Sequence, residues 1–321
     1  PRRPHAAQAG RMSAPAGWQP RSWLFVPGDS ERKQAKAQGT AADALILDLE
    51  DSVAPRALPA ARELVAGALG AAAAQAGGPQ LWVRVNSLQS GLLPLDLAAV
   101  CARALPAGVM LPKVSAPEEI IEVAARLTAL EVSHRLPVGT LRLLVLTTET
   151  AQGVMNLPRY PQVLNAAPAV RERIAGLTWG SEDLGAALGT LSKRGADGAL
   201  SFPFQLARTQ CLLAAAALGV AAVDGVTADF KDGAALAREL LEARRDGFYG
   251  KLAIHPDQVR PINSSFTPTA AECEHAQAVV AAFAASPDTG VASLAGQMID
   301  RPHLLQAQRV LARMGQAGRR A

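Results

Sequence analysis

The sequence predicts a (β/α)8 barrel followed by a helical extension. Three observations point to this fold. Short runs of apolar and β-branched residues recur eight times between residues 21 and 256. Segments with helical spacing separate these runs, and such alternation produces a parallel sheet. The eight units together span roughly 250 residues, which is the usual size of a closed barrel.

The predicted strands are apolar along most of their length, as strands buried on both faces should be. Their ranges are 21–27, 44–50, 81–86, 108–114, 141–150, 176–183, 219–226 and 250–256. Residues 117–130 and 204–219 exemplify the helical segments between them. The alternative is an open doubly wound sheet. It is disfavoured because no GxGxxG follows the first strand, and because the residues around Gly250 and Lys251 lack the phosphate-loop pattern.

Both ends of the chain lie outside the predicted barrel, which we place at 21–265. Residues 1–20 are basic and rich in Pro and Ala, and they lack the apolar stretch of a signal peptide, so we expect a flexible tail. Residues 266–321 are expected to form a helical lid segment, with helices at 271–284 and 302–314. The link between these helices, 286–300 (SPDTGVASLAGQMID), is rich in Gly, Ser and Asp, which is typical of a hinge or lid.

Composition argues against several classes of function. The net charge is +4, but removing the five tail arginines leaves −1 for the rest of the chain (Arg2, Arg3, Arg11, Arg319 and Arg320). No recognition-helix, RNP or zinc-finger pattern is present, so we expect no nucleic-acid partner. No apolar run reaches the roughly 18 residues of a membrane span, so we expect no membrane contact. Three widely spaced cysteines form neither a disulfide framework nor a CxxC site, and a reducing cytoplasm is the expected compartment.

Charged and polar residues gather where the predicted strands end, and in a barrel these positions meet at the catalytic mouth. Each has a simpler explanation. A strand-end aspartate often caps a helix, a lone arginine is usually an ion-pair partner, and a histidine before proline is more typical of a structural role than of a base. Capping does not explain why so many strands end this way. The residues concerned are Asp48, Glu50, Asp51, Arg84, Asn86, Lys113, Glu149, Glu182, Asp183, Asp224 and His255.

The carboxylates suit a hard cation. Magnesium takes one or two protein carboxylates and completes its octahedron with water and substrate oxygens. Glu149 and Asp183, from adjacent predicted strands, fit that demand, and Mn²⁺ is a possible substitute. Zinc is disfavoured because neither HExxH nor paired Cys/His spacing occurs. A divalent ion facing a 2-oxo or 2-hydroxy acid would polarise its oxygen. Arg84 could then stabilise the enolate that C–C cleavage leaves behind.

Eight stretches, in order from about residue 21 to residue 265, carry a resemblance to a known family. They are RSWLFVPGDSERKQAKA, ADALILDLEDSV, LWVRVNS, MLPKV, LTTETAQGV, LTWGSEDLGAALG, AAVDGV and GFYGKLAIHP. Together they are similar to the motifs of the citrate lyase β-subunit and malyl-CoA lyase family, within the HpcH/HpaI aldolase superfamily. The resemblance implies a barrel, usually trimeric or built from trimers. It also implies bound magnesium and substrates that are CoA or acyl-carrier thioesters of hydroxy acids.

Carried over residue by residue, the resemblance assigns roles at the mouth. It implies that Glu149 and Asp183 are the metal ligands, with Glu149 also meeting the substrate, and that Arg84 binds substrate and stabilises the enolate. It implies that Glu50 and Asp51 orient Arg84 or the metal waters. Arg21 is implied in contact with the CoA phosphates.

The stretch GQMIDRP at 296–302 resembles a segment of the malyl-CoA and citramalyl-CoA branch. There, an aspartate on the terminal lid reaches the neighbouring protomer's site as acid/base, which implies that role for Asp300. The alternative is that Asp300 only caps the helix that begins near Pro302. The branch acting on free 2-oxo acids uses a histidine near the end of the second strand. LDLEDSV has none, so the thioester branch is preferred.

The leading hypothesis is a magnesium-dependent C–C lyase, or Claisen-type synthase, acting on a hydroxyacyl-CoA such as citramalyl-CoA or malyl-CoA. The expected partners are an acyl-CoA, a 2-oxo or hydroxy acid, and further copies of the chain in a homotrimer or dimer of trimers. The alternatives are a thioesterase on the same substrates, the citryl-thioester lyase subunit of a citrate lyase complex, and a non-enzymatic CoA-binding subunit. The retained set of Arg84, Glu149 and Asp183 argues against the last.

Overall fold

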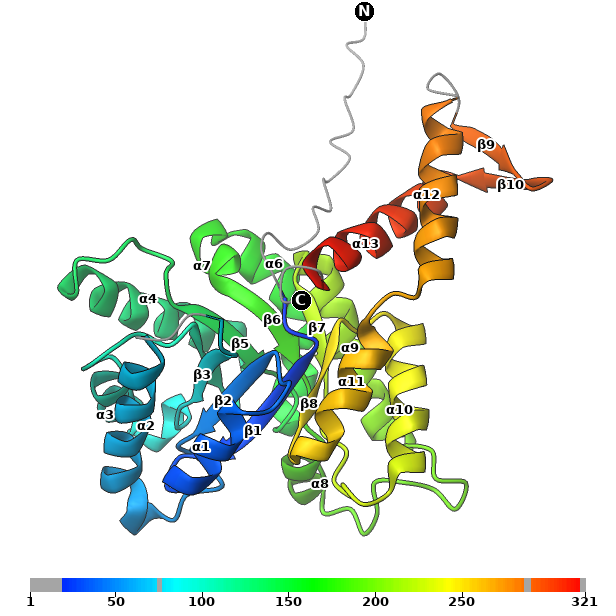
Figure 1. Cartoon of the computed structure of the whole chain (residues 1–321). Coiled ribbons are helices and arrows are strands. Elements are labelled where there is room, and N and C mark those ends of the chain that lie inside the picture. Colours follow the sequence, from blue (N-terminus) through cyan, green and yellow to red (C-terminus); the bar gives the residue numbers. More distant parts are fainter. Residues whose placement is uncertain (1–18, 74–76, 286–289, 318–321) are drawn as a thin grey trace, which may run out of the picture.

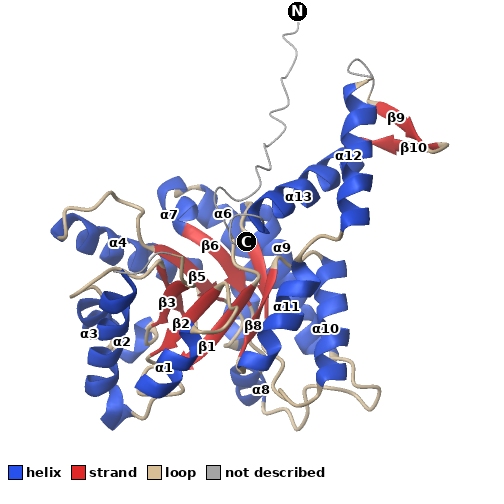
Figure 2. Ribbon diagram, in the orientation of Figure 1, coloured by secondary structure: helices blue, strands red, loops and turns tan. Residues whose placement is uncertain are grey.

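Eight parallel strands close into a barrel in the order β1 to β8, with β8 pairing back onto β1 (Figures 1 and 2). The computed structural model describes residues 19–73, 77–285 and 290–317. The predicted N-terminal tail therefore lies almost wholly outside the described residues. The strands are β1 Ser22–Pro27, β2 Ala44–Asp48, β3 Gln80–Arg84, β4 Gly108–Leu111, β5 Arg142–Leu146, β6 Ile174–Thr178, β7 Ala221–Asp224 and β8 Gly250–Ala253.

Helices surround the barrel and connect successive strands (Figure 2). They are α1 Glu31–Gln38, α2 Leu58–Ala73, α3 Leu93–Val100, α4 Pro117–Ser133, α5 Ala151–Asn156, α6 Tyr160–Asn165, α7 Pro168–Arg173, α8 Glu182–Leu188, α9 Phe202–Leu218, α10 Gly233–Asp246 and α11 Val259–Phe266. Short 3-10 turns lie at Pro55–Ala57, Leu88–Ser90, Leu157–Arg159 and Pro256–Gln258. The barrel prediction is confirmed.

The predicted strands were too long at several ends. The chain turns out of the sheet at the mouth, so β5 ends at Leu146 and β6 at Thr178, and the polar residues that follow lie in loops. The predicted seventh strand began too early. Gly219 caps α9 in the left-handed conformation (φ 70°), which glycine adopts without steric cost, and β7 starts two residues later.

The core has two layers. Inside the barrel, Trp23 and Trp82 pack edge to face with their ring centroids 5.0 Å apart. Gly108 is the register partner of Trp82, and a Cβ at Gly108 would lie 2.4 Å from the Trp82 ring, so only glycine leaves room for the indole. Between barrel and helices, aliphatic residues such as Leu45, Val83 and Val145 are fully buried. This packing fixes the strand ends on which the site is built.

The C-terminal segment projects from the end of the barrel opposite α8 (Figure 1). It contains α12 Ala270–Ala284, a hairpin of β9 Val291–Leu294 and β10 Gln297–Asp300, and α13 Arg301–Ala317. Arg313 of α13 donates a hydrogen bond to the Phe248 carbonyl (3.3 Å) and lies over the Tyr249 ring. Both partners precede β8, so α13 packs against the amino-terminal end of the barrel.

No strand was predicted in the link at 286–300, but residues 291–300 form this hairpin. Ala295 and Gly296 both have positive φ (51° and 78°), the geometry of a two-residue hairpin turn. Ala292 and Ile299 pack on α12 and α13, and this burial supplies the stability that two short strands lack alone. Residues 286–289 lie outside the described part of the chain.

Candidate active site

A pocket of about 450 Å³ opens at the carboxyl ends of the strands. Its charged lining residues include Arg84, Glu149 and Asp183, three of the residues predicted from the sequence. Apolar side chains complete the lining. The full lining is Phe25, Pro27, Asp48, Asp51, Ser52, Arg84, Leu146, Glu149, Trp179, Gly180, Ser181, Glu182, Asp183, Val226, Leu252 and Ile254. The pocket therefore combines several carboxylates and one arginine with apolar side chains.

Arg84 is held rigidly by carboxylates. Asp48 ends β2 opposite Arg84 in the strand register, and its two oxygens accept from Nε and Nη2 of Arg84, both at 2.7 Å. Nη1 lies 2.9 Å from Glu50 Oε2 and 3.5 Å from Asp51 Oδ2. Burial alone would raise the pKa of Asp48, but the hydrogen bonds and charge of Arg84 outweigh it and lower that pKa. Asp48 therefore remains ionised and fixes the guanidinium plane at the pocket wall.

Glu149 and Asp183 line the same pocket from neighbouring strand ends. Glu149 follows β5 and is 4% exposed, and it accepts a hydrogen bond from the Lys113 backbone N–H at 2.6 Å. Burial raises the pKa of Glu149 to about 8. The Lys113 hydrogen bond opposes this rise, whereas the charge of Asp183 adds to it. The two carboxylates repel each other across a shared space.

A cation between these two carboxylates would remove that repulsion, so the donor set fits magnesium, which needs only one or two protein carboxylates. Glu149 and Asp183 would hold it. Within residues 19–73, 77–285 and 290–317, no group of three or more His, Cys, Asp or Glu side chains is arranged to bind a metal. Such a group is what a site built entirely from protein ligands would require.

Glu50 and Asp51 join the arginine to Lys113. Glu50 Oε1 and Asp51 Oδ1 both accept from Lys113 Nζ, the latter at 2.8 Å. Burial raises the pKa of Glu50, and the charges of Arg84 and Lys113 only partly offset this effect. The pKa of Asp51 is lowered, because its hydrogen bond to Lys113 and the charge of Arg84 outweigh its burial. The structure thus places both carboxylates beside Arg84.

The structure does not bring Arg21 to this pocket. Arg21 precedes β1, at the amino-terminal end of the barrel, where Nε lies 2.7 Å from Asp43 Oδ2 and Nη1 donates to Thr267 Oγ1 at 2.7 Å. Its guanidinium ties the first strand to the segment after α11. The contact with CoA phosphates that the resemblance implies for Arg21 stays a prediction.

Asp300 is also outside the pocket of its own chain. It ends β10 and is exposed, and its Oδ1 lies 2.6 Å from His303 Nδ1 in the first turn of α13. The Asp300 backbone N–H also donates to His303 Nδ1 at 3.2 Å. This local contact agrees with a helix-start role within one chain. Figure 1 shows the β9–β10 hairpin away from the barrel, beside α12.

Three other strand-end residues have structural roles. Asn86 Nδ2 donates to the Leu49 carbonyl at 2.8 Å, tying two loops together. The Asp224 carboxylate accepts from Trp179 Nε1 at 2.7 Å and from Lys251 Nζ at 2.9 Å in the barrel interior. His255 caps the 3-10 turn that follows it, through a hydrogen bond from the Asp257 backbone N–H.

Sequence reasoning gave no specific role to Asp48, Lys113 or Trp179. Asp48 and Glu50 alternate with Leu49, so both point to the same side of the chain near the end of β2, a signal that could have linked Asp48 to Arg84. The indole of Trp179 forms part of the pocket wall. No sequence pattern signals the reach of Lys113 across the mouth, because it depends on the backbone conformation.

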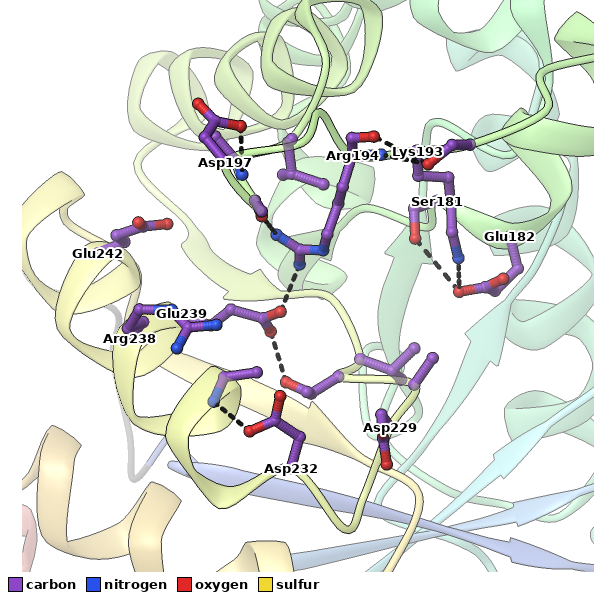
Figure 3. Close-up of a pocket in the computed structure, with 18 residues that line it drawn as sticks. Ser181, Glu182, Lys193, Arg194, Asp197, Asp229, Asp232, Arg238, Glu239 and Glu242 are labelled. Atoms are coloured by element: carbon purple, nitrogen blue, oxygen red, sulfur yellow. Dashed lines mark hydrogen bonds and ion pairs between the residues drawn. The ribbon is translucent and has the colours of Figure 1, made fainter.

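A second pocket, of about 540 Å³, lies beside the first and shares Ser181, Glu182 and Val226 with it. Figure 3 shows Lys193 directed at Glu182 and Arg194 directed at Glu239. Its acidic residues (Glu182, Asp197, Asp229, Asp232, Glu239 and Glu242) outnumber its basic ones (Lys193, Arg194 and Arg238). The phosphates of a nucleotide would be repelled there.

The sequence matches a known family over residues 21–256, described as HpcH/HpaI aldolase/citrate lyase, which covers most of the barrel. The chain belongs to this family. It is therefore an enzyme of a C–C lyase family, as its motifs predicted. Mitochondrial citramalyl-CoA lyase from Mus musculus is 34% identical over 297 residues, covering 91% of this chain and 85% of that protein.

Relatives named for other activities are as similar to this chain as the citramalyl-CoA lyase is. (3S)-malyl-CoA thioesterase from Cereibacter sphaeroides is 36% identical over 295 residues, covering 91% of this chain and 94% of that protein. Among solved structures, protein CitE from Mycobacterium tuberculosis, in complex with magnesium, acetoacetate and coenzyme A, superposes with a TM-score of 0.71 at 33% identity. That match covers 93% of this chain and 99% of the CitE chain.

Within the described residues, no helix combines the length and the apolar character needed to cross a membrane.

Proposed function

We propose that the protein is a magnesium-dependent lyase that cleaves, and in reverse forms, a C–C bond in a hydroxyacyl-CoA such as citramalyl-CoA or malyl-CoA. Mn²⁺ is the expected substitute metal. The observation that supports this most strongly is the meeting of Arg84, Glu149 and Asp183 in one pocket that also has apolar side chains. The citramalyl-CoA lyases that this chain resembles, and the CitE complex with magnesium and coenzyme A, support the same reaction class.

In the proposed reaction, the substrate hydroxyl loses its proton and its oxygen becomes the carbonyl of a 2-oxo acid. The C–C bond breaks, and its electron pair passes to the thioester fragment as an enolate. That enolate then takes a proton at carbon and leaves as an acyl-CoA such as acetyl-CoA. When bound by Glu149 and Asp183, magnesium supplies Lewis-acid polarisation of the substrate oxygens.

Arg84 lies where it can balance the enolate charge. Its guanidinium is fixed by Asp48 before substrate arrives, so little reorganisation is needed as charge develops. Asp48 and Glu50 keep Arg84 protonated, because their charges raise its pKa further despite its burial. The ring of Phe25 packs against the guanidinium, whose Cζ lies 4.9 Å from the ring centroid, and Val226 and Leu252 add apolar surface to the same pocket.

We further propose that Asp300 acts as the acid/base in the pocket of a neighbouring protomer. Residues 21–265 would then be the catalytic barrel, and 266–321 a lid and oligomerisation segment in a homotrimer or dimer of trimers. The distance of the hairpin from its own mouth supports action in trans (Figure 1). Asp300 is exposed, so only its contact with His303 has to break for it to reach a neighbour.

Subunit mixing tests this assignment. Asp300→Ala and Arg84→Ala are each expected to be inactive, because each lacks one part of every site. After subunit exchange, an intact lid from one protomer can cover an intact pocket of another, so activity should return. A mixture that stays inactive means that Asp300 serves its own barrel. If Asp300→Ala alone retains full activity, the residue is only a helix-start residue.

Two other activities are alternatives, because relatives of this chain are named for them. A thioesterase would use the same metal to aim water at the thioester, and the Cereibacter sphaeroides protein is named for this activity on (3S)-malyl-CoA. A citryl-thioester lyase subunit is the other, since relatives from Mycobacterium tuberculosis are named citrate lyase subunit beta-like. Product analysis of the purified chain with citramalyl-CoA or malyl-CoA separates them. A lyase releases acetyl-CoA, a thioesterase releases free CoA, and a citryl-specific subunit leaves both substrates intact.

A further inference from the structure

Lys113 has an unusual backbone at the edge of the active-site pocket. Its φ is 53°, in the left-handed region that side-chain-bearing residues seldom occupy. Two other non-glycine residues in the described chain share this feature, Arg135 and Ala295, and both lie in exposed turns. Lys113 follows β4 and Pro112 at the mouth, where such backbone strain is commonly tied to function.

This conformation lets one residue touch two groups of carboxylates. The backbone N–H of Lys113 donates to Glu149 Oε2 at 2.6 Å. Its ammonium extends across the mouth to Glu50 Oε1 and Asp51 Oδ1, the two carboxylates beside Arg84. The same ammonium lies 3.6 Å from Asp183 Oδ1. Lys113 therefore connects the residues around Arg84 with the two proposed metal ligands.

The carboxylates at the mouth explain why the ammonium of Lys113 lies there. Among the described residues, five carboxyl groups converge there with the guanidinium of Arg84 and the ammonium of Lys113 (Asp48, Glu50, Asp51, Glu149 and Asp183). A divalent ion bound to Asp183 would lie close to this ammonium, and like charges at such a distance repel. The ammonium is already nearer to Asp51 than to Asp183, at 2.8 Å against 3.6 Å, so it keeps a partner when it withdraws.

We propose that Lys113 is a positioning residue whose backbone N–H holds Glu149 in place, while its ammonium, held by Glu50 and Asp51, partly neutralises Asp183 and withdraws from it when the metal binds. This inference rests on the proposed magnesium function. It adds a competition between a resident ammonium and the divalent ion. The ammonium then reduces the repulsion between carboxylates at the mouth when no metal is bound. It also weakens metal binding, because it repels the incoming ion.

Metal binding without substrate tests the competition directly. Mn²⁺ is titrated into wild type, Lys113→Met and Lys113→Arg, and the dissociation constant is measured by calorimetry or by the spin resonance signal of free Mn²⁺. Lys113→Met retains the backbone N–H but not the charge, so it should bind Mn²⁺ roughly tenfold more tightly. Lys113→Arg keeps a cation and should stay close to wild type.

Lys193→Met is the matched control. Lys193 is also 28% exposed and lies at the rim, but it pairs with Glu182 and not with a proposed metal ligand. Screening by salt should keep its effect on Mn²⁺ affinity within about twofold. Lys113→Gln, which is neutral but polar, serves in place of Lys113→Met if circular dichroism shows that the methionine variant does not fold.

The outcomes separate this inference from the function on which it rests. If wild type binds Mn²⁺ and the neutral variants bind equally well or more weakly, the ammonium does not compete and the role of Lys113 is refuted. If Lys193→Met tightens binding as much as Lys113→Met, the effect is one of overall charge and the specific role is again refuted. If wild type binds neither Mn²⁺ nor Mg²⁺, the magnesium function itself fails, and the inference fails with it.

Discussion

Glu149→Gln should stabilise the metal-free protein while abolishing its response to magnesium. The glutamine is nearly isosteric, and its Oε1 can still accept the Lys113 backbone N–H that Glu149 accepts at 2.6 Å. What it removes is a buried negative charge facing Asp183. The structure thus predicts that one residue lowers stability in the absence of metal and is required for metal binding.

The magnitude follows from the pKa of Glu149. Burial is the main cause of its rise from 4.5 to about 8, which corresponds to about 5 kcal/mol of stability lost once the carboxyl is ionised in the folded state. The folded protein holds this proton between those two pH values and the unfolded chain does not, so wild-type stability falls as pH rises from 4.5 to 8. Water entering the pocket offsets part of the cost. We therefore expect a gain of about 2 kcal/mol or more in the variant at pH 8.5.

Thermal unfolding at pH 5 and pH 8.5 measures this effect, in EDTA and then in magnesium. The variant should unfold roughly 3 °C above wild type at pH 8.5 in EDTA, with a smaller difference at pH 5. Magnesium should raise the unfolding temperature of wild type only. Glu182→Gln is the control, because Glu182 is exposed at the rim and should change neither property. Equal stability at pH 8.5, or an equal magnesium effect in both proteins, refutes the reasoning.

Three further outcomes are expected. Chelation with EDTA should abolish turnover, with Mg²⁺ or Mn²⁺ restoring it, and full activity in excess EDTA would exclude the metal. Arg84→Lys should lower turnover on the order of 10²-fold, because lysine lacks the two-donor fork that Asp48 holds. The magnesium-induced thermal shift should survive in this variant. Unchanged turnover would mean that Arg84 is only an ion-pair partner. The pKa of Asp224 is lowered because the charges of Lys251 and Arg208 outweigh the effect of its burial. This carboxylate therefore stabilises the fold above pH 3.8, and its contribution is lost as the pH falls through the lowered pKa. Asp224→Ala should cost on the order of 3 kcal/mol in urea unfolding at pH 7, and a loss near zero would contradict the role of this buried network.

The site was partly predictable because barrel topology converts order along the chain into position in space. Once Arg84, Glu149 and Asp183 are placed at the ends of parallel strands, closure of the barrel brings them to one mouth. Their partners were harder to assign. The bidentate contact of Asp48 with Arg84 depends on the register of β2 against β3, and a shift of one residue would turn Asp48 to the other face of the sheet.

Arg21 illustrates the opposite case. It lies in a stretch with a strong family resemblance, yet it stands at the amino-terminal end of β1 and binds Asp43. The two ends of a barrel strand are separated by its whole length, so a motif that spans a strand does not say which of its residues reach the pocket. The hairpin at 291–300 was missed because each strand has only four residues and its stability comes from packing on α12 and α13.

The sequence by itself determined the alternation of strands and helices, the barrel, the family and the three central polar residues. The alternation and the barrel follow from periodicity, whereas the family and the roles of those residues follow from the resemblance of eight motifs, and both are properties of the chain order alone. The tertiary structure alone decided the left-handed backbone of Lys113 and the reach of its ammonium to Asp51 and Asp183. It also decided the raised pKa of Glu149, because burial and the distance between charges from different strands exist only after the barrel has closed.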